Sequence, residues 1–343
     1  MAVIRDVMPA FDLLQPGSAA DAQKLLQQHG DEAWVMAGGL DSFDWLKDRI
    51  KRPKVLVDLS GIDELKGIRS TSDGVEIGSM TTLTEIANHP EIKAKYSVLS
   101  DAVAVVASPQ IRNQGTLGGN VSQDARCWYY RGGWPCYRAG GNICYADTPV
   151  GRNREHAIFG ANRCVAVHPS DSAPALIVLD AKFVIQTPKG ERVVDAEDYF
   201  LGPEIDITHL HILQPGDLLT AIRIPSTWAG ARFYFEKVRD RNVWDFALMN
   251  VASAMVLTGG NPSDARIDRA RIAVSAVAPR PMRLKTVEDA VRGKPADATT
   301  GEMAGKLAVQ GAVPLQFNAY KIPLMRNLVK RAIGGVQEAT WTS

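Results

Sequence analysis

The first 60 residues alternate between helical and extended spacing of their apolar positions. Ser18 can cap a helix through ADAQKLLQQHG, and Gly30 can end it. The apolar runs AWVMAGG and VLVDLS have the length and composition of short strands. The intervening LDSFDWLKDRI has apolar residues at helical spacing, at Phe43, Leu46 and Ile50. We therefore expect a strand, a glycine turn, a helix and a second strand.

Residues 61–225 carry a second series of elements. GIRSTSDGVEIGSM predicts a hairpin turning at Asp73–Gly74, and a helix capped by Thr81 or Thr82 follows until Pro90 ends or kinks it. The apolar run YSVLSDAVAVVAS predicts a buried helix that leads to IRNQGTLGGN. Further on, HPSDSAPALIVLDAKFVIQTPKGERVV predicts a capped helix and a hairpin, and DLLTAIRIP predicts a strand.

Residues 230–335 form a third series. ARFYFEKV alternates as a strand does, whereas FALMNVASAMVL and ARIAVSAVA fit either two buried strands or a helix–strand pair. Two helices are expected to close the chain, the second within NAYKIPLMRNLVKRAIGGV, with their lysines and arginines on solvated faces. The pattern thus predicts three mixed units, at 1–60, 61–225 and 230–335, in a chain that is long for one core.

Charge and hydropathy exclude some classes of function. The 343 residues carry a formal net charge of +1 and no basic tract, which argues against nucleic acid as the main partner. No apolar run reaches the roughly 18 to 20 residues that span a bilayer. The N-terminal MAVIRDVMPAFDLLQP lacks the apolar core of a signal peptide. We therefore expect no membrane span and a cytoplasmic location.

Two glycine-rich turns are candidates for anion binding. The first is AGGLDS, from Ala37 to Ser42, and the second lies within IRNQGTLGGN. Glycines leave no Cβ in the way of a ligand, and successive N–H groups in such turns can hold phosphate oxygens. The alternative is that both turns are only structural. Two turns of this size suit a ligand with two phosphates, although the Rossmann pattern G-x-G-x-x-G is absent.

All four cysteines lie in one short window, at Cys127, Cys136, Cys144 and Cys164. Four thiolates are the complement of an iron–sulfur cluster, and the aromatic residues between them would exclude water from it. The alternatives are a zinc site, disulfides and buried free thiols. Zinc is disfavoured because no C-x-x-C pair is present, and unrelated thiols would be expected at scattered positions. The residues alone leave these alternatives open.

The motifs AGGLDS, IRNQGTLGGN and HPSD resemble those of the FAD-binding medium subunits of the molybdenum hydroxylases, the xanthine dehydrogenase and carbon monoxide dehydrogenase group. The family patterns are A-G-G-T-[DN] and R-N-x-G-T-x-G-G-N, and the resemblance covers nearly the whole chain. The cysteine segment, at about 124–166, resembles the branch of periplasmic aldehyde oxidoreductase and 4-hydroxybenzoyl-CoA reductase, whose FAD subunits carry an extra 4Fe–4S cluster. The implied fold is α+β, with two FAD-binding subdomains of the vanillyl-alcohol-oxidase type and a C-terminal α+β domain.

The resemblance also implies which residues meet the cofactors. The pyrophosphate of FAD would lie against the first turn, at Val35, Met36, Ala37, Gly38, Gly39, Leu40, Asp41 and Ser42. It would also lie against the second turn, at Thr116, Gly118, Gly119 and Asn120. Further contacts with FAD would come from Ala107, from Ser122, from Asp171 on the adenosine side, and from Leu218 and Lys237 near the flavin. The 4Fe–4S cluster would be ligated by Cys127, Cys136, Cys144 and Cys164. Leu40 replaces the usual threonine and so removes a hydroxyl from the phosphate site.

The function that the resemblance implies is electron transfer within a complex. A large subunit would hold the molybdenum cofactor and oxidise an aldehyde or an aromatic or heterocyclic substrate, and a small subunit would hold 2Fe–2S clusters. Electrons would reach FAD in this chain and leave for an external acceptor. Two alternatives stay open, a self-sufficient FAD oxidoreductase and a non-enzymatic metal-binding or redox-sensing module. Export together with a partner that carries the signal would make the location periplasmic.

Overall fold

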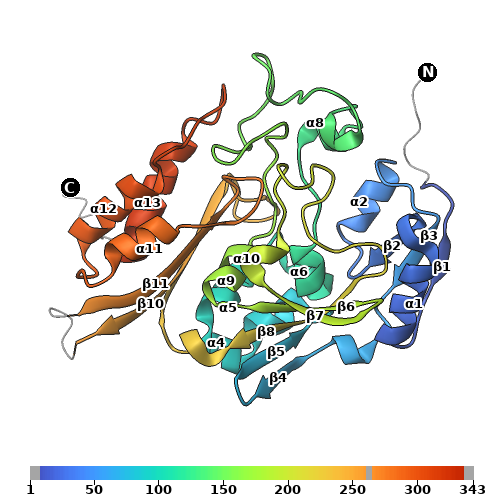
Figure 1. Cartoon of the computed structure of the whole chain (residues 1–343), viewed down its shortest axis with the longest axis horizontal. Coiled ribbons are helices and arrows are strands. Elements are labelled where there is room, and N and C mark those ends of the chain that lie inside the picture. Colours follow the sequence, from blue (N-terminus) through green and yellow to red (C-terminus); the bar gives the residue numbers. More distant parts are fainter. Residues whose placement is uncertain (1–7, 260–264, 336–343) are drawn as a thin grey trace.

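The computed structural model describes residues 8–259 and 265–335, in which three sheets are packed with helices (Figure 1). The first and third sheets lie at opposite ends of the molecule, with the second between them (Figure 1). The predicted α+β class is confirmed. The unit limits 1–60, 61–225 and 230–335 stay a prediction, and residues 1–7 and 260–264 lie outside the described part. No helix in the described ranges is long and apolar enough to cross a membrane.

The first sheet is parallel, with the strands in the order β1 (Asp12–Leu14), β3 (Val55–Asp58) and β2 (Ala33–Met36). The connection from β1 to β2 is α1 (Ala19–His29). Both predicted ends of this helix are confirmed. The N–H of Asp21 donates to Ser18 Oγ at its start, and Gly30 ends it with a φ of 51°. All of β3 is buried, so this central strand fixes where β2 and the glycine turn after it lie.

The helix after that turn is α2 (Ser42–Lys47), and it is shorter than predicted. The chain leaves helical geometry at Arg49, whose φ is 58°. Its inward face also differs from the prediction, because Trp45 and Leu46 are buried whereas the Phe43 ring is 37% exposed. Phe43 instead lies over the glycine turn, where a Cβ on Gly39 would be 2.9 Å from the ring.

The second sheet is antiparallel, in the order β4-β5-β8-β6-β7. Its strands are β4 (Ile68–Thr71), β5 (Gly74–Gly78), β6 (Lys182–Thr187), β7 (Gly190–Asp195) and β8 (Leu218–Pro225). The two predicted hairpins are confirmed as the pairs β4–β5 and β6–β7. The strand predicted in DLLTAIRIP is β8, which lies at the centre of the sheet.

Helices cover this sheet and complete its core. They are α3 (Leu83–Asn88), α4 (Pro90–Lys95), α5 (Ser97–Ala104), α9 (Ser172–Val178) and α10 (Ala196–Tyr199). Thr82 and Glu85 form a capping box on α3, and Pro90 begins α4 as its first residue. The core between α5, α9 and the sheet continues to Ala252 and Ala273 of the third sheet, which joins the two units.

Between α5 and α9 the chain makes a long excursion. It contains the short helices α6 (Pro109–Gln114), α7 (Leu117–Val121) and α8 (Trp128–Arg131). Most of the remainder is loop, drawn in green at the top of Figure 1. This excursion holds the second glycine turn and all four cysteines.

The third sheet is antiparallel, in the order β12-β11-β10-β9. Its strands are β9 (Arg232–Val238), β10 (Met249–Thr258), β11 (Arg266–Ser275) and β12 (Met282–Arg283). FALMNVASAMVL and ARIAVSAVA therefore contribute two buried strands, which is one of the two predicted outcomes. The chain then forms α11 (Lys285–Val291), α12 (Ala298–Ala308) and α13 (Lys321–Gly334), so the prediction of two closing helices was wrong.

The basic residues of these helices were predicted to face solvent, and for Lys321 this prediction was wrong. Its side chain is fully buried, and its Nζ donates to Glu155 O at 2.8 Å and to Ala276 O at 2.6 Å. Burial lowers the pKa of Lys321 to about 7. The lysine joins the cysteine-bearing excursion to the turn after β11.

Candidate functional site

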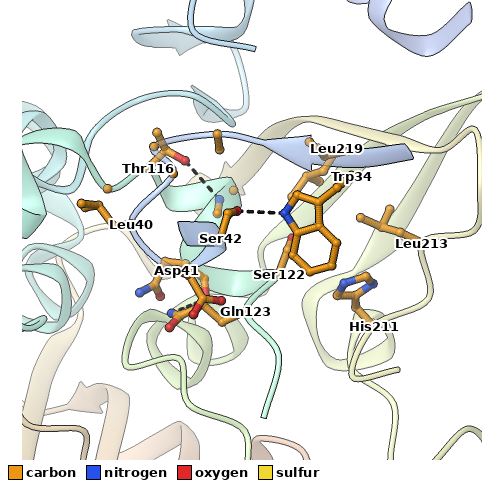
Figure 2. A pocket seen from close by; sticks show the side chains of 18 of the residues that line it. Trp34, Leu40, Asp41, Ser42, Thr116, Ser122, Gln123, His211, Leu213 and Leu219 are labelled. Atoms are coloured by element: carbon orange, nitrogen blue, oxygen red, sulfur yellow. Dashed lines mark hydrogen bonds between the residues drawn. The ribbon is translucent and has the colours of Figure 1, made fainter. Parts of the chain in front are cut away.

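A cavity of about 780 Å³ lies where the three sheets meet. Its walls include Trp34 and Val35 of β2, Leu218 at the start of β8 and Lys237 of β9. Both glycine turns face it. In Figure 2 the indole of Trp34 donates to Ser42 Oγ, at 2.9 Å, and thereby ties β2 to the start of α2. The volume is within the range of sites that hold organic cofactors.

The first turn is held against the second by a close backbone approach. A Cβ on Gly38 would lie 2.2 Å from Gln114 O, so only glycine fits here. The Gln114 side chain also binds the first turn, because its Nε2 donates to Gly38 O at 2.9 Å. Gly39 follows with a φ of 78°, in the left-handed region that glycine adopts readily. The two turns therefore form one wall of the cavity.

Backbone donors in the first turn are free for a ligand. Among the residues that the structure describes, none accepts a hydrogen bond from the N–H groups of Gly38, Gly39 or Leu40. Unpaired N–H groups next to a cavity normally find an acceptor, and consecutive ones suit the oxygens of a phosphate. This turn has the donor chemistry that was predicted for it.

The second turn differs, because its N–H groups are used within the protein. Leu117 N donates to Thr81 O at 3.0 Å, Gly118 N to Ser79 O at 2.9 Å, and Gly119 N to Thr116 Oγ1 at 3.1 Å. A Cβ on Gly118 would lie 2.8 Å from Ser79. The glycines here permit close packing, and the turn supplies a wall rather than a row of free donors. Ser79, a residue of the same wall, has a buried Oγ with no hydrogen-bond partner among the residues that the structure describes.

The HPSD motif supports the floor of the cavity. Ser170 Oγ and Ser172 Oγ each donate to Asn120 Oδ1 at 2.6 Å, which fixes the second turn to the start of α9. Asp171 forms a buried ion pair with Lys237, with 2.5 Å between Oδ2 and Nζ. Asn250 Nδ2 donates to the other carboxylate oxygen at 3.0 Å. Burial raises the pKa of Asp171, and the neighbouring Lys237 opposes that rise.

The fold brings nearly all of the residues that were predicted to contact FAD to the wall of this cavity. Every residue predicted to contact FAD except Met36 lines the cavity, including Leu40 in place of the usual threonine. The sequence reasoning missed several lining residues, namely Trp34, Ser79, Gln123, Arg126, His211, Trp244 and Phe246. Trp34 could have been found, since it directly precedes the predicted stretch in AWVMAGG. Gln123 could likewise have been found, since it directly follows the predicted contact Ser122. The remaining residues carry no motif and reach the cavity only through the tertiary fold.

Two strained residues meet at the rim of the cavity. Ala107 has a φ of 40° and Trp244 a φ of 75°, in a region that non-glycine residues rarely adopt. They are joined, because Trp244 N donates to Ala107 O at 2.8 Å. Phe246 lies nearby, with the Arg126 guanidinium 4.5 Å from its ring centroid. Strain of this kind is concentrated at functional sites.

The four cysteines gather in a second, neighbouring place. All four are free thiols, and Cys136 and Cys164 are buried. Cys127, Cys136 and Cys164 share one hydrophobic cluster, whose other members include Trp45, Tyr130 and Tyr145. Burial raises the pKa of the Cys144 thiol, and the neighbouring Cys164 adds to this rise. Burial raises the pKa of the Cys127 thiol to about 11, and His156 Nε2 lies 3.3 Å from its sulfur.

Within the described ranges, no group of three or more His, Cys, Asp or Glu side chains is arranged to hold a metal ion. The cluster assignment therefore stays a prediction. A 4Fe–4S cluster binds one thiolate on each of its irons, so its ligands surround a larger body than a single ion. Four free thiols in an aromatic enclosure have the donor chemistry for such a body.

A buried group of charges lies between the cavity and the cysteines. Asp124 Oδ2 is 3.0 Å from Lys51 Nζ and accepts from Tyr130 OH at 3.1 Å, and Asp124 Oδ1 is 3.4 Å from Arg138 Nη1. Burial favours the neutral form of Asp124, but Lys51 and Arg138 outweigh it and hold the pKa of this carboxyl below its ordinary value. The carboxylate is therefore charged at neutral pH.

Comparison with protein families matches the chain to two models that together cover most of it. Residues 9–227 match the FAD binding domain in molybdopterin dehydrogenase. Residues 233–336 match the CO dehydrogenase flavoprotein C-terminal domain.

Similar proteins agree with these matches. The chain is 34% identical to the aldehyde oxidoreductase FAD-binding subunit PaoB of Escherichia coli, over 82% of this chain and 86% of that protein. It is 28% identical to the carbon monoxide dehydrogenase medium chain of Hydrogenophaga pseudoflava, over 95% and 97% of the two chains. A solved structure of carbon monoxide dehydrogenase from H. pseudoflava superposes with a TM-score of 0.74 over 95% of this chain and 96% of that one, at 28% identity. Quinoline 2-oxidoreductase from Pseudomonas putida gives a TM-score of 0.72 at 25% identity, over 95% and 96% of the two chains.

Proposed function

This chain belongs to the family of FAD-binding subunits of the molybdenum hydroxylases, and on that premise we propose that it carries electrons through FAD to an external acceptor. The observation that carries the proposal is the cavity of about 780 Å³ that both glycine turns line, turns that lie in the part of the chain matching the FAD-binding family. When bound, FAD takes up and releases electrons, while the protein binds and orients it.

The binding of FAD is assigned to particular groups. The free N–H groups of Gly38, Gly39 and Leu40 would hold pyrophosphate oxygens, and the second turn would pack against the same phosphates through its glycines. Asp171 has both carboxylate oxygens in use by Lys237 and Asn250, so its main part would be to hold Lys237 in place at the cavity. Ala107, Ser122 and Leu218 would form walls against the cofactor.

A 4Fe–4S cluster on Cys127, Cys136, Cys144 and Cys164 is the second part of the proposal. Its support is the gathering of four free thiols beside the FAD cavity and the similarity of the cysteine segment to the cluster-bearing branch of the family. Cluster binding would replace four free thiols by thiolates on iron.

The partners and the substrate follow from the family. We propose a large subunit with the molybdenum cofactor, which oxidises an aldehyde or an aromatic or heterocyclic compound, and a small subunit with 2Fe–2S clusters that pass electrons to FAD. The names of similar proteins support this division, since they are called an FAD-binding subunit and a medium chain. The three sheets would correspond to two FAD-binding subdomains and a C-terminal domain. The proposed location is cytoplasmic, with co-export to the periplasm as the alternative.

Native purification tests this function. The expected preparation contains a large molybdenum-bearing chain, a small iron–sulfur chain and this chain, with flavin absorption bands and a broad iron–sulfur shoulder. Turnover of an organic substrate by this chain alone would favour a self-sufficient FAD oxidoreductase instead. A colourless preparation that contains zinc would favour the non-enzymatic metal-binding module.

A further inference from the structure

Three charged side chains connect the FAD cavity with the cysteines. Asp124 lies in the middle, with Lys51 Nζ at 3.0 Å on one side and Arg138 Nη1 at 3.4 Å on the other. The side chain of Lys51 is 27% exposed, that of Asp124 15% and that of Arg138 2%, so the group is largely shielded from water. Lys51, Asp124 and Arg138 are called the charge bridge below.

The two ends of the charge bridge face different redox sites. Lys51 lines the FAD cavity. Arg138 lies at the cysteine end, because it follows Cys136 by two residues and its guanidinium lies 5.7 Å from the ring centroid of Tyr130, which packs in one cluster with Cys136 and Cys164. Asp124 joins these ends, so the bridge leads from the wall of the cavity to the cysteine end.

The charge bridge has a net charge of +1, because two cations share one carboxylate. The neighbouring charges do not cancel it, since Arg126 and Arg131 are paired with Asp41 and Asp44. Two buried histidines close to the bridge are neutral at pH 7, because burial lowers the pKa of His168 to about 3 and that of His211 to about 4. The excess positive charge thus belongs to the bridge itself.

An excess buried cation is costly unless an anion lies near it. Arg138 Nε is buried and has no partner within the described part of the chain. Anionic groups are expected on both sides of the bridge, the phosphates and reduced flavin of FAD on one side and cysteine thiolates on iron on the other. The two cofactors proposed above would supply the anions that this charge lacks within the described part of the chain.

We propose that Lys51, Asp124 and Arg138 act as an electrostatic bridge that raises the reduction potentials of both FAD and the iron–sulfur cluster. A net positive charge favours the reduced form of each centre, because that form carries more negative charge. Lys51 acts mainly on FAD and Arg138 mainly on the cluster, since each lies at its own end. The cluster part rests on the function proposed above, whereas the FAD part rests on the family alone.

Potentiometric titration of the purified complex tests the bridge, with absorbance reporting FAD and low-temperature paramagnetic resonance reporting the cluster. Lys51→Met is expected to lower the potential of FAD more than that of the cluster, and Arg138→Met the reverse. Asp124→Asn is expected to raise both potentials. A unit charge removed at this range changes a one-electron equilibrium constant by about tenfold, or about 59 mV.

Matched variants separate charge from structure. Lys51→Arg and Arg138→Lys keep the charge and are expected to leave both potentials near those of the wild type. Lys189→Met, on the exposed β6–β7 hairpin, is expected to change neither. Flavin content per chain confirms that each variant is folded.

The proposal is supported if Lys51→Met and Arg138→Met lower the reduction potentials while Asp124→Asn raises them. Shifts of the same sign in Lys51→Met and Asp124→Asn, or no shift of either centre, would overturn it. Iron and sulfide analysis of the wild type keeps the two proposals apart. If the wild type lacks a cluster, the cluster assignment fails, while the FAD potentials of Lys51→Met and Asp124→Asn still decide whether the bridge exists.

Discussion

At the scale of single residues, the buried pair of Asp171 and Lys237 has the largest predicted energetic effect. Both side chains are less than 5% exposed, so neither charge has water as a substitute partner. Breaking such a pair by removing one partner costs about 3–5 kcal/mol, because the other charge stays buried and unpaired. Lys237→Met is expected to lower the free energy of unfolding by this amount in urea titrations at pH 7.

The pH dependence of that loss follows from the sign of the shift. Burial already raises the pKa of Asp171 above its unfolded value, and removal of Lys237 raises it further. When the folded-state pKa of a carboxyl is raised, the free energy of unfolding falls as the pH rises past that pKa, because a buried charge then forms. The loss of stability in Lys237→Met should therefore become smaller as the pH falls. The double variant Lys237→Met with Asp171→Asn should regain most of the loss. A defect that is equal at pH 5 and pH 8 would contradict this account.

Single residues also show what the sequence could predict and what it could not. Gly38 and Gly118 were predicted at the cofactor from their motifs, and both line the cavity. The reason for glycine at these positions was not predictable, because it depends on residues far away in the sequence. A Cβ on Gly38 would collide with Gln114 O, and a Cβ on Gly118 would collide with Ser79. Met36 was predicted as part of the stretch 35–42 that the family resemblance implies, and it lies outside the lining.

At the scale of elements, the excursion between α5 and α9, which holds the four cysteines, gives a direct prediction. Replacement of any one of Cys127, Cys136, Cys144 or Cys164 by serine should lower the iron and sulfide content from about four of each per chain. A hard alkoxide is a poor substitute for thiolate on iron. FAD should largely remain, because the free donors of the first turn lie outside the excursion.

Cys164 is the decisive position in this series. It is the most distant of the four in sequence, yet it is buried and packs in one hydrophobic cluster with Cys127 and Cys136. Cys164→Ser should therefore lose the cluster as completely as Cys127→Ser, measured by iron and acid-labile sulfide analysis. A cluster that is indifferent to Cys164→Ser, or a wild type without sulfide, would refute the ligand set.

Local signals predicted the elements best. Ser18, Gly30 and Thr82 mark real helix boundaries, because caps depend on a few adjacent residues. The hairpin predicted at Asp73–Gly74 also forms, with its turn one residue earlier, at Ser72–Asp73. The face of α2 was predicted less well, since the helix ends early and Phe43 packs over Gly39 instead of into the core. The choice between strand and helix for FALMNVASAMVL required the sheet itself, because a continuous apolar run fits both.

At the scale of the whole molecule, Lys321 couples distant units. Its Nζ contacts Glu155 O and Ala276 O, and Asn318 nearby donates to His156 O and Ala157 O, so α13 and the residues before it hold the cysteine excursion onto the third sheet. No local pattern predicted this, because a lysine at the start of an amphipathic helix normally faces solvent.

The lowered pKa of Lys321 makes stability depend on pH. Its folded pKa is about 7 and its ordinary value is 10.5, so the unfolded chain binds the extra proton between these values. Stability should therefore rise with pH across this window. Lys321→Met should remove that rise, as measured by urea unfolding at pH 7 and pH 9. Parallel pH profiles for the wild type and the variant would show that the lysine does not titrate in this range.

The lining of the FAD cavity by residues from Leu26 to Phe246 has a consequence for synthesis of the protein. A chain leaves the ribosome from its N-terminus at about 5–20 residues per second, and its early units can fold before the later ones exist. Both glycine turns emerge early, but Lys237 and the rim at Trp244 emerge only after about two thirds of the chain. The complete pocket can therefore form only after residues from all three sheets have been made, so the N-terminal units alone cannot enclose FAD.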